Sequence, residues 1–182
     1  MSDRRARFQA QVLPHLDAAY NLARWLARPP LDADDIVQDA MLRAFRAFDT
    51  FRGDNAKPWL LCIVRNCFLT AAGNARRTRN VPIAEDDQTD ADDPAWTADA
   101  PDPESAAISA GERRRLDEVL ALLPREFREV LVLREMEDLS YREIAQITGA
   151  PIGTVMSRLA RARGLLKEKW HNDLERNAYV LQ

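Results

Sequence analysis

The 182-residue sequence contains few of the residues that proteins use for metal binding, redox chemistry or cross-linking. It has two cysteines, Cys62 and Cys67, and two histidines, His15 and His171. The cysteines lie five positions apart on one expected helix, so their side chains leave in different directions and cannot easily form a disulfide. We interpret them as reduced packing residues. Neither histidine has a second ligand at metal spacing, so we expect no metal site and no cofactor.

Sequence motifs for nucleotide binding and for hydrolysis are also absent. The chain has no GxxxxGK[ST] phosphate loop, no GxSxG nucleophile elbow and no GxGxxG turn, so we expect that it is not an enzyme. No apolar run approaches the roughly 20 residues of a membrane span. The N-terminal stretch MSDRRARFQ lacks the apolar segment of a signal peptide. We therefore expect a cytoplasmic protein that does not insert into membranes.

Charge is unevenly distributed along the chain, although the formal net charge is only -3. Residues 1–80 carry 13 Arg and Lys against 8 Asp and Glu, and residues 113–182 carry 13 against 11. Residues 81–112 carry 10 acidic residues, no basic residue and four prolines. Because this segment has few large apolar groups, it cannot offset the entropy lost on ordering, and we predict a flexible acidic linker. It is either a solvated tether or a strand that imitates nucleic acid in a partner's basic channel, with Trp96 as an anchor.

The segments on either side of this linker have the periodicity of amphipathic helices, which predicts an all-α fold of two small helical domains. In the first domain we expect a helix from about Phe8 to Ala27 and another after the Pro29–Pro30 break. Asp32 or Asp34 can cap this second helix. A third helix is expected from Trp59. The positions assigned to the three core faces are Leu13, Leu16, Ala19, Tyr20, Ala23 and Leu26; Val37, Met41, Ala44, Phe45 and Phe48; and Leu60, Ile63, Val64, Cys67 and Ala71.

The second domain contains a stretch, SYREIAQITGAPIGTVMSRLARARGLLKEK, with the layout of a helix-turn-helix. Ser140 and Glu143 have the S-x-x-E spacing of a capping box, which starts the first helix. Gly149 tolerates the left-handed backbone that ends a helix, and Pro151 suits the first turn of the next one. The two helices are expected over residues 141–147 and from about 152 to about 169.

At 100° per residue, the second helix of this motif has two different faces. Arg161 can bind guanine with its forked guanidinium, and Ser157 can contact a base or a phosphate. Arg158 and Arg163, on the flanks, point toward phosphates or neighbouring carboxylates. A solvated cationic face is the alternative, but the cap, the turn and the small residues all favour DNA binding. The apolar stripe is Val155, Leu159, Ala162 and Leu166, and the opposite, mostly small stripe is Gly153, Ser157, Ala160, Arg161 and Gly164.

Two surfaces of the first domain have both a functional and a purely structural interpretation. On the second helix, Leu42 lies among acidic and amide groups, which suits a protein partner, although acids near a helix start also suit the helix dipole. The loop FRGDNAKP and the basic helix end NARRTRN could hold single-stranded DNA with flipped bases. Taken alone, these two features are better explained as a solvated loop and a helix C-terminus balanced by arginines.

Three stretches together resemble a known family: LDADDIVQDAMLRAFRAFDTF, PWLLCIVRN and LPREFREVLVLREMEDLSYREIAQITGAPIGTVMSRLARAR. They are similar to bacterial RNA polymerase sigma factors of the extracytoplasmic-function (ECF) group of the sigma-70 family. The resemblance implies that residues 1–80 bind core polymerase and melt the minus-10 promoter element, and that residues 113–182 read the minus-35 element. It further implies core RNA polymerase, promoter DNA and an anti-sigma factor as partners, and a role in stress-responsive transcription initiation.

The resemblance also assigns roles to individual residues, none of them catalytic. The residues implied to bind core polymerase are Asp35, Gln38, Asp39, Leu42 and Arg43. Those implied to bind the minus-10 element are Asn55, Ala56, Lys57, Arg65, Asn66, Arg76 and Arg77. Those implied to bind the minus-35 element are Thr154, Ser157, Arg158, Arg161 and Arg163.

Two other classes of protein are compatible with parts of this pattern. A conventional helix-turn-helix regulator would bind its operator without polymerase, usually as a symmetric dimer with a ligand or receiver domain. The acidic segment 81–112 looks like a tether and offers no such sensor. A helical adaptor that binds only proteins would not need the arginine-bearing second helix.

Overall fold

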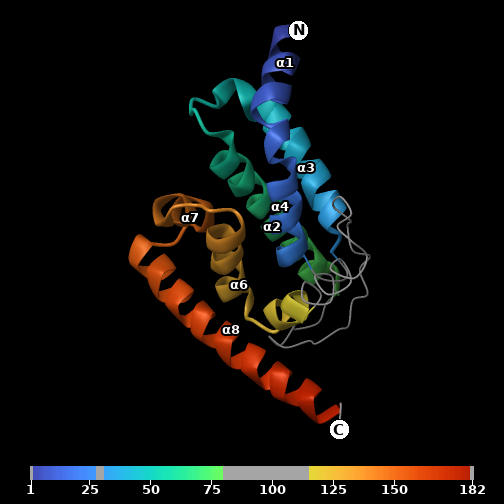
Figure 1. Cartoon of the computed structure of the whole chain (residues 1–182). Helices are drawn as coiled ribbons and strands as arrows, with labels where there is room; N and C mark the ends of the chain where they lie inside the picture. Colours follow the sequence, from blue (N-terminus) through green and yellow to red (C-terminus); the bar gives the residue numbers. More distant parts are fainter. Residues whose placement is uncertain (1, 28–30, 80–114, 181–182) are drawn as a thin grey trace, which may run out of the picture.

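The computed structural model describes residues 2–27, 31–79 and 115–180, and every regular element in these ranges is helical (Figure 1). This confirms the expected all-α fold with two helical domains. The acidic segment 81–112, with Trp96, lies outside the described residues. The N-terminal domain contains α1 (Ser2–Gln11), η1 (Leu13–His15), α2 (Leu16–Leu26), α3 (Ala33–Ala47), η2 (Phe48–Thr50) and α4 (Ala56–Arg79). The C-terminal domain contains a helix over residues 115–121, α6 (Arg125–Leu131), η3 (Val132–Met136), α7 (Tyr141–Thr148) and α8 (Ile152–Val180).

The first helix of the N-terminal domain is interrupted, so the predicted continuous helix from Phe8 to Ala27 is wrong. The break is centred on Pro14, which has no N–H to donate and whose ring clashes with the carbonyl four residues earlier. The chain tightens into the 3-10 turn η1, in which His15 N–H donates to the Val12 carbonyl at 3.0 Å. The predicted core stripe is only partly correct: Ala19, Ala23 and Leu26 are buried, whereas Leu13 in η1 and Tyr20 in α2 are exposed.

Helix α3 begins where the sequence predicts, with Asp32 as its cap. The Asp32 carboxylate accepts a hydrogen bond from the Asp34 N–H at 2.8 Å, which satisfies a free donor of the first turn. The assigned core face is only partly correct, because Phe45 lies at its edge with 37% of its surface exposed. There its ring makes a T-shaped contact with the Phe8 ring, with 5.1 Å between the ring centroids. The side chains that α3 buries are Ile36, Val37, Ala40 and Ala44.

Helix α4 begins at Ala56, three residues before the predicted start at Trp59. The reason is a local cap, because the Asn55 side-chain oxygen accepts from the Lys57 N–H at 3.0 Å. Pro58 lies within the first turn, where its missing N–H costs nothing. The side chains that α4 buries are Ala56, Leu60, Leu61, Val64, Cys67 and Phe68.

The helix-turn-helix is present as predicted. Ser140 and Glu143 form the reciprocal capping box, and Gly149 ends α7 with a left-handed backbone, φ 67°. Helix α8 buries Val155, Leu159 and Ala162, whereas Leu166 is half-buried. It continues to Val180, well beyond the predicted end near residue 169.

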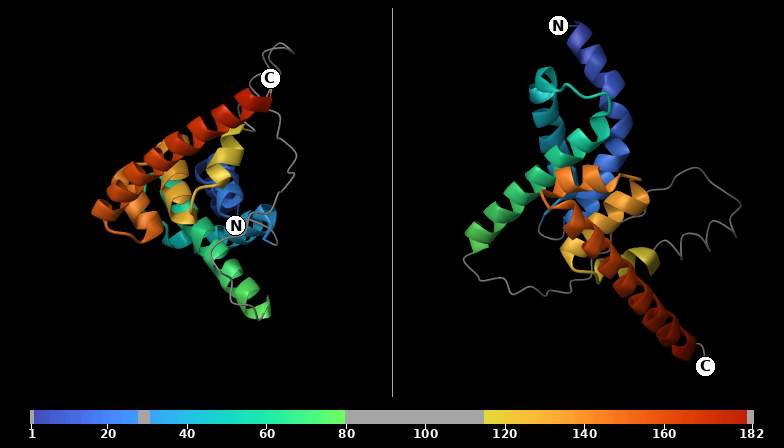
Figure 2. Two further views of the ribbon diagram at one scale, coloured as in Figure 1. Left: turned by 90° about the horizontal axis from the view of Figure 1, so that it is seen from below. Right: turned by 90° about the vertical axis from the view of Figure 1, so that its left-hand side faces the viewer.

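The two domains pack against each other through a shared apolar core. One cluster joins side chains of α2, α3 and α4 to side chains of α6, α7 and α8, including Val130, Ile144 and Leu159. Trp25 of α2 packs into a second cluster, with Leu120 and other side chains of the C-terminal domain. Both views in Figure 2 show the far ends of α4 and α8 projecting from this shared body.

We predict that replacing Leu60 by alanine lowers the free energy of unfolding by about 2–5 kcal/mol, because its fully buried side chain would leave a cavity. Leu69 lies on the same helix with 38% of its surface exposed, so Leu69→Ala should change that free energy by less than about 0.5 kcal/mol. Urea unfolding followed by circular dichroism measures both variants. Equal losses would contradict the assignment of the α4 core face.

Candidate functional site

The N-terminal half of α8 presents an exposed face opposite its buried stripe. This face has the small residues at its centre and Arg161 at one side, as predicted. Ser157 is also exposed, and its hydroxyl donates to the Thr154 carbonyl at 3.0 Å. Among the described residues, no ion pair or hydrogen bond engages the Arg161 guanidinium, so it can bind an incoming acceptor without losing a partner.

The two flanking arginines of α8 are held by carboxylates of the same domain. Arg158 pairs with Glu126 of α6 at 3.1 Å, and Arg163 donates twice to Glu135 of η3, at 2.6 and 3.0 Å. The hydrogen bonds that Arg163 donates to Glu135 raise the pKa of the Arg163 guanidinium above its ordinary value. For Arg158 and Arg163 the sequence left two kinds of partner open, phosphates or neighbouring carboxylates. In this structure both arginines pair with carboxylates.

The residues implied for the minus-10 element are spread along α4 and do not form one cluster. Asn55 and Asn66 are exposed, whereas Ala56 is buried in the core. Lys57 and Arg65 both face the C-terminal domain, where they meet buried carboxylates. Arg76 and Arg77 are exposed near the end of α4, roughly 30 Å from Lys57 at 1.5 Å per residue.

On α3, the residues implied to bind polymerase do share one surface. Asp35, Gln38 and Leu42 are exposed, and Leu42 has 58% of its surface open to solvent. Arg43 donates to Asp39 through two nitrogens, at 3.0 and 2.8 Å. The hydrogen bonds from Arg43 lower the pKa of the Asp39 carboxyl below its ordinary value. The surface is therefore anionic, with a leucine projecting from it.

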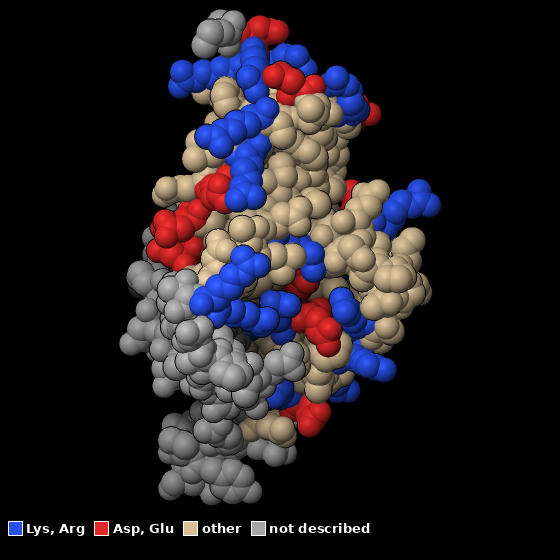
Figure 3. All heavy atoms as spheres, turned by 180° about the vertical axis from the view of Figure 1, so that it is seen from behind, with Lys and Arg blue, Asp and Glu red and all other residues tan. Residues whose placement is uncertain are grey.

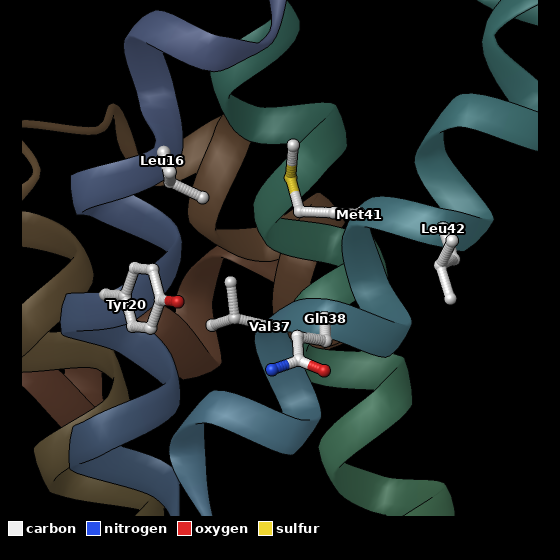
Figure 4. A pocket seen from close by; sticks show the side chains of 6 residues that line it. All are labelled: Leu16, Tyr20, Val37, Gln38, Met41 and Leu42. Atoms are coloured by element: carbon white, nitrogen blue, oxygen red, sulfur yellow. The ribbon is translucent and has the colours of Figure 1, made fainter.

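A groove of about 360 Å³ lies beside this surface, between α2 and α3. Figure 4 shows Leu16 and Tyr20 of α2 facing Val37 and Met41 of α3 across it. The apolar periodicity of the sequence predicted core positions for all four residues and gave no indication of this groove. Leu42 and Gln38 complete its rim, so the groove and the anionic surface of α3 are continuous.

Charged side chains are grouped on the molecular surface. On the face opposite to that of Figure 1, acidic and basic side chains lie beside one another in mixed groups, and uncharged areas lie between these groups (Figure 3). Within the described ranges, no set of three His, Cys, Asp or Glu side chains could hold a metal ion. The helices in these ranges also include none that is long and apolar enough to cross a membrane.

Both cysteines are free thiols, in agreement with the prediction that they do not pair. Cys67 is buried behind Asp39, in a small hollow that also contains Asp35. Burial, and secondarily the nearby Asp39 carboxylate, raises the pKa of the Cys67 thiol to about 11. At neutral pH this thiol is therefore protonated and a poor nucleophile.

An arginine-bearing helix in the second position of a helix-turn-helix, with its small-residue face exposed, defines a DNA-binding protein of the helix-turn-helix class. Comparison with known families agrees with this. Residues 12–78 match the family described as Sigma-70 region 2, and residues 113–166 match Sigma-70, region 4. The chain belongs to the ECF group of the sigma-70 family of RNA polymerase sigma factors. The resemblance stated from the sequence is confirmed, and the protein functions as an RNA polymerase sigma factor.

Individual relatives support the same assignment. The chain is 36% identical over 152 residues to the ECF RNA polymerase sigma-E factor of Haemophilus influenzae, covering 81% of this chain and 78% of the relative. It is 35% identical to the protein of the same name from Escherichia coli K12, covering 78% and 75%. Among solved structures, the sigma factor RpoE in complex with the anti-sigma factor NepR from Bartonella quintana has a TM-score of 0.71 at 29% identity, covering 90% of this chain and 96% of that one. CnrH in complex with the cytosolic domain of CnrY has a TM-score of 0.60 at 26% identity, covering 93% and 90%.

We predict that Cys67 reacts slowly with iodoacetamide, because a thiol with a pKa of about 11 is only about 0.1% thiolate at pH 8. In a Cys62→Ser background, the labelling rate should rise roughly tenfold per pH unit between pH 8 and 10. Asp39→Asn in the same background should accelerate labelling, since the Asp39 charge helps to raise this pKa. A rate at pH 8 equal to that of an unperturbed thiol would contradict the assignment.

Proposed function

We propose that this sigma factor uses three separate surfaces to start transcription at specific promoters. The α3 surface holds core polymerase, the α4 face and the preceding loop hold the opened minus-10 strand, and the exposed face of α8 reads the minus-35 element. The domain limits that follow are residues 1–80 and 113–182, with 81–112 as the linker. The observation that carries this proposal is the pair of exposed, chemically distinct faces on α3 and α8, each backed by a buried apolar stripe.

For minus-35 recognition, the order of importance of the α8 residues follows from their surroundings. Arg161 is exposed and free of carboxylates, so its guanidinium can donate two hydrogen bonds to a guanine edge. Ser157 lies one turn earlier and can contact a base or a phosphate. Arg158 and Arg163 are already paired with Glu126 and Glu135. We therefore assign them to phosphate contacts at the groove edges. Thr154 is half-buried at the start of the same face.

For core-polymerase binding, we propose that Asp35, Gln38, Asp39 and Arg43 give polar contacts around the exposed Leu42. The groove between α2 and α3 extends this surface with Leu16, Tyr20 and Met41. An apolar pocket inside a charged rim is the usual anatomy of a specific protein interface. A helix that carries an apolar residue and basic groups would match both parts.

For the minus-10 element, we propose that Asn55, Lys57, Arg65 and Asn66 contact the unpaired strand. Cations bind its phosphates, and the amides can hydrogen-bond to a flipped base. Ala56 is buried, so its part is limited to placing its neighbours at the helix start. Arg76 and Arg77, far along α4, would bind phosphates of flanking duplex DNA.

We further infer that this protein performs no bond chemistry and needs no cofactor, since binding and strand capture suffice for the role. We propose that it acts in the cytoplasm, where polymerase and chromosomal DNA are found. The complexes of RpoE with NepR and of CnrH with CnrY suggest an anti-sigma protein as a further partner. We propose that such a protein would cover the α3 surface and so exclude polymerase.

Run-off transcription tests the minus-35 assignment. Core polymerase with this protein should start at defined sites on a genomic fragment library, and these sites supply the promoter for the variant test. Arg161→Ala should then weaken initiation about ten- to hundredfold on the native promoter and much less when the minus-35 element is scrambled. Lys167→Ala, the same change of charge further along α8, is the control. Equal loss on both templates would reduce Arg161 to a phosphate contact.

Replacing both Asp35 and Asp39 by alanine should weaken binding to core polymerase at least about tenfold, because two charged contacts of the interface are removed. The exposed pair Asp49 and Asp54 provides a control with the same change of charge. Fluorescence anisotropy of labelled protein titrated with core polymerase measures both variants, and circular dichroism checks their folding. Unchanged affinity of the Asp35/Asp39 variant would refute this surface.

A further inference from the structure

Helix α8 carries two large apolar side chains that are exposed beside its buried stripe. Met156 has 52% of its surface open to solvent and Ile152 has 45%, whereas the neighbouring Val155 and Leu159 are buried. Single exposed apolar residues are common on protein surfaces. These two, however, lie four positions apart on one helix, so their side chains are neighbours on the same side. Together with the exposed Ala160, four positions further on, they form what we call the apolar row.

The apolar row borders the face of α8 that we propose for reading the minus-35 element. At 100° per residue, the row turns from the side of the buried stripe toward the small residues, and Ser157 and Arg161 lie beyond these. The row begins in the first turn of α8, at the outer edge of the molecule beside α7 (Figure 1). In a helix-turn-helix, the N-terminal residues of the second helix are the ones that contact base edges.

The backbone beside the apolar row is open to the exterior. A Cβ atom built on Gly153 or Gly164 would meet no atom within 4 Å, so packing among the described residues does not require glycine at either position. Another molecule can therefore come close to the helix backbone at this face. The longer side chains of Ile152 and Met156 would then contact that molecule first.

Arginines on both sides of the apolar row favour a nucleic acid over an apolar protein as this molecule. Arg163 lies on the same side of α8 as Met156, about two turns further on and roughly 10 Å along the axis at 1.5 Å per residue. Glu135 holds the Arg163 guanidinium, which we assign to a phosphate at the groove edge. Because the major groove is about 12 Å wide, Met156 then lies among the base edges.

Among the bases, thymine presents an apolar group in the major groove, the C5 methyl. The other three bases present hydrogen-bond donors and acceptors there, which an aliphatic side chain cannot satisfy and would separate from water. Burying one methyl group against an apolar side chain is worth about fourfold in affinity. The apolar row therefore suits thymine better than any other base.

We propose that Met156, flanked by Ile152 and Ala160, selects thymine in the minus-35 element by contact with its C5 methyl group, while Arg161 selects guanine. The proposal rests on the assignment of the exposed face of α8 to that element. Apolar contact and hydrogen bonding are separate interactions, so each selection is lost without the other. The minus-35 element of this protein therefore contains at least one thymine whose methyl group is needed for full affinity.

The methyl contact is tested by replacing each thymine of the minus-35 element in turn by deoxyuridine, which removes the methyl group and keeps every hydrogen-bonding group. Polymerase reconstituted with this protein is titrated onto fluorescent duplexes of a promoter defined by the run-off experiment. The wild type should lose about fourfold in affinity at one or two positions. At such a position, 5-methyldeoxycytidine should bind better than deoxycytidine by a similar factor, since it carries the methyl group without the thymine hydrogen bonds.

Variants of the side chain identify which residue makes the contact. Met156→Ala should bind the thymine and deoxyuridine duplexes equally, whereas Met156→Leu, which keeps an apolar side chain of similar volume, should retain the preference for thymine. The control is Met136→Ala, the same change at a methionine outside α8 with 41% of its surface exposed, and it should behave as the wild type. Retention of the full thymine preference in Met156→Ala would overturn the proposal.

Failure of this proposal and failure of the proposed minus-35 surface give different results. If no deoxyuridine position weakens binding, but scrambling the element and Arg161→Ala both do, only the methyl contact is rejected. A minus-35 element without thymine on either strand would reject it as well. If scrambling the element has no effect on the wild type, the α8 surface is rejected and the methyl contact with it.

Discussion

A carboxylate buried in a protein must be paired with a cation or a hydrogen-bond donor, and this constraint determines how the two domains of this sigma factor sit together. Glu129 and Glu137 are buried in the contact, and their charges are balanced from outside their own domain. Removing a carboxylate from water costs several kcal/mol unless good geometry compensates for it. Lys57 and Arg65 are spaced along α4 so that each meets one of them. Apolar side chains make up most of the contact between the domains, and the two ion pairs fix the position of α4 relative to the C-terminal domain.

The two surfaces that we propose for binding follow from a second constraint: each helix has one side packed in the core and one side exposed. Helix α8 buries Val155 and Leu159 while its small residues and Arg161 stay exposed. Helix α3 does the same with Val37 inside and Leu42 outside. Because a helix in a small domain is packed on one side only, its free side is available for a partner without loss of stability. The groove lined by Leu16, Tyr20 and Met41 lies between two such helices, α2 and α3.

Local signals in the sequence predicted much of the fold, because they depend on neighbours in the chain. The capping box at Ser140, the left-handed Gly149 and the two faces of α8 are properties of a few adjacent residues, and all three are present. The two helix bounds that were predicted wrongly also have local causes, which the apolar periodicity does not reveal. Pro14 divides a helix that the apolar stripe made look continuous, and the Asn55 cap starts α4 earlier than its apolar pattern does.

By itself, the sequence determined the all-α class and the family, since these depend on composition, spacing and motif, and it supplied the residues that we propose for binding polymerase and DNA. Only the tertiary structure decided which of those residues are buried or already paired with another side chain. Spacing cannot reveal that Lys57 meets Glu137 across 80 positions, that Ala56 is buried, or that Tyr20 borders a groove. These are consequences of how separate helices pack, and burial and electrostatic pairing between distant segments are set by that packing alone.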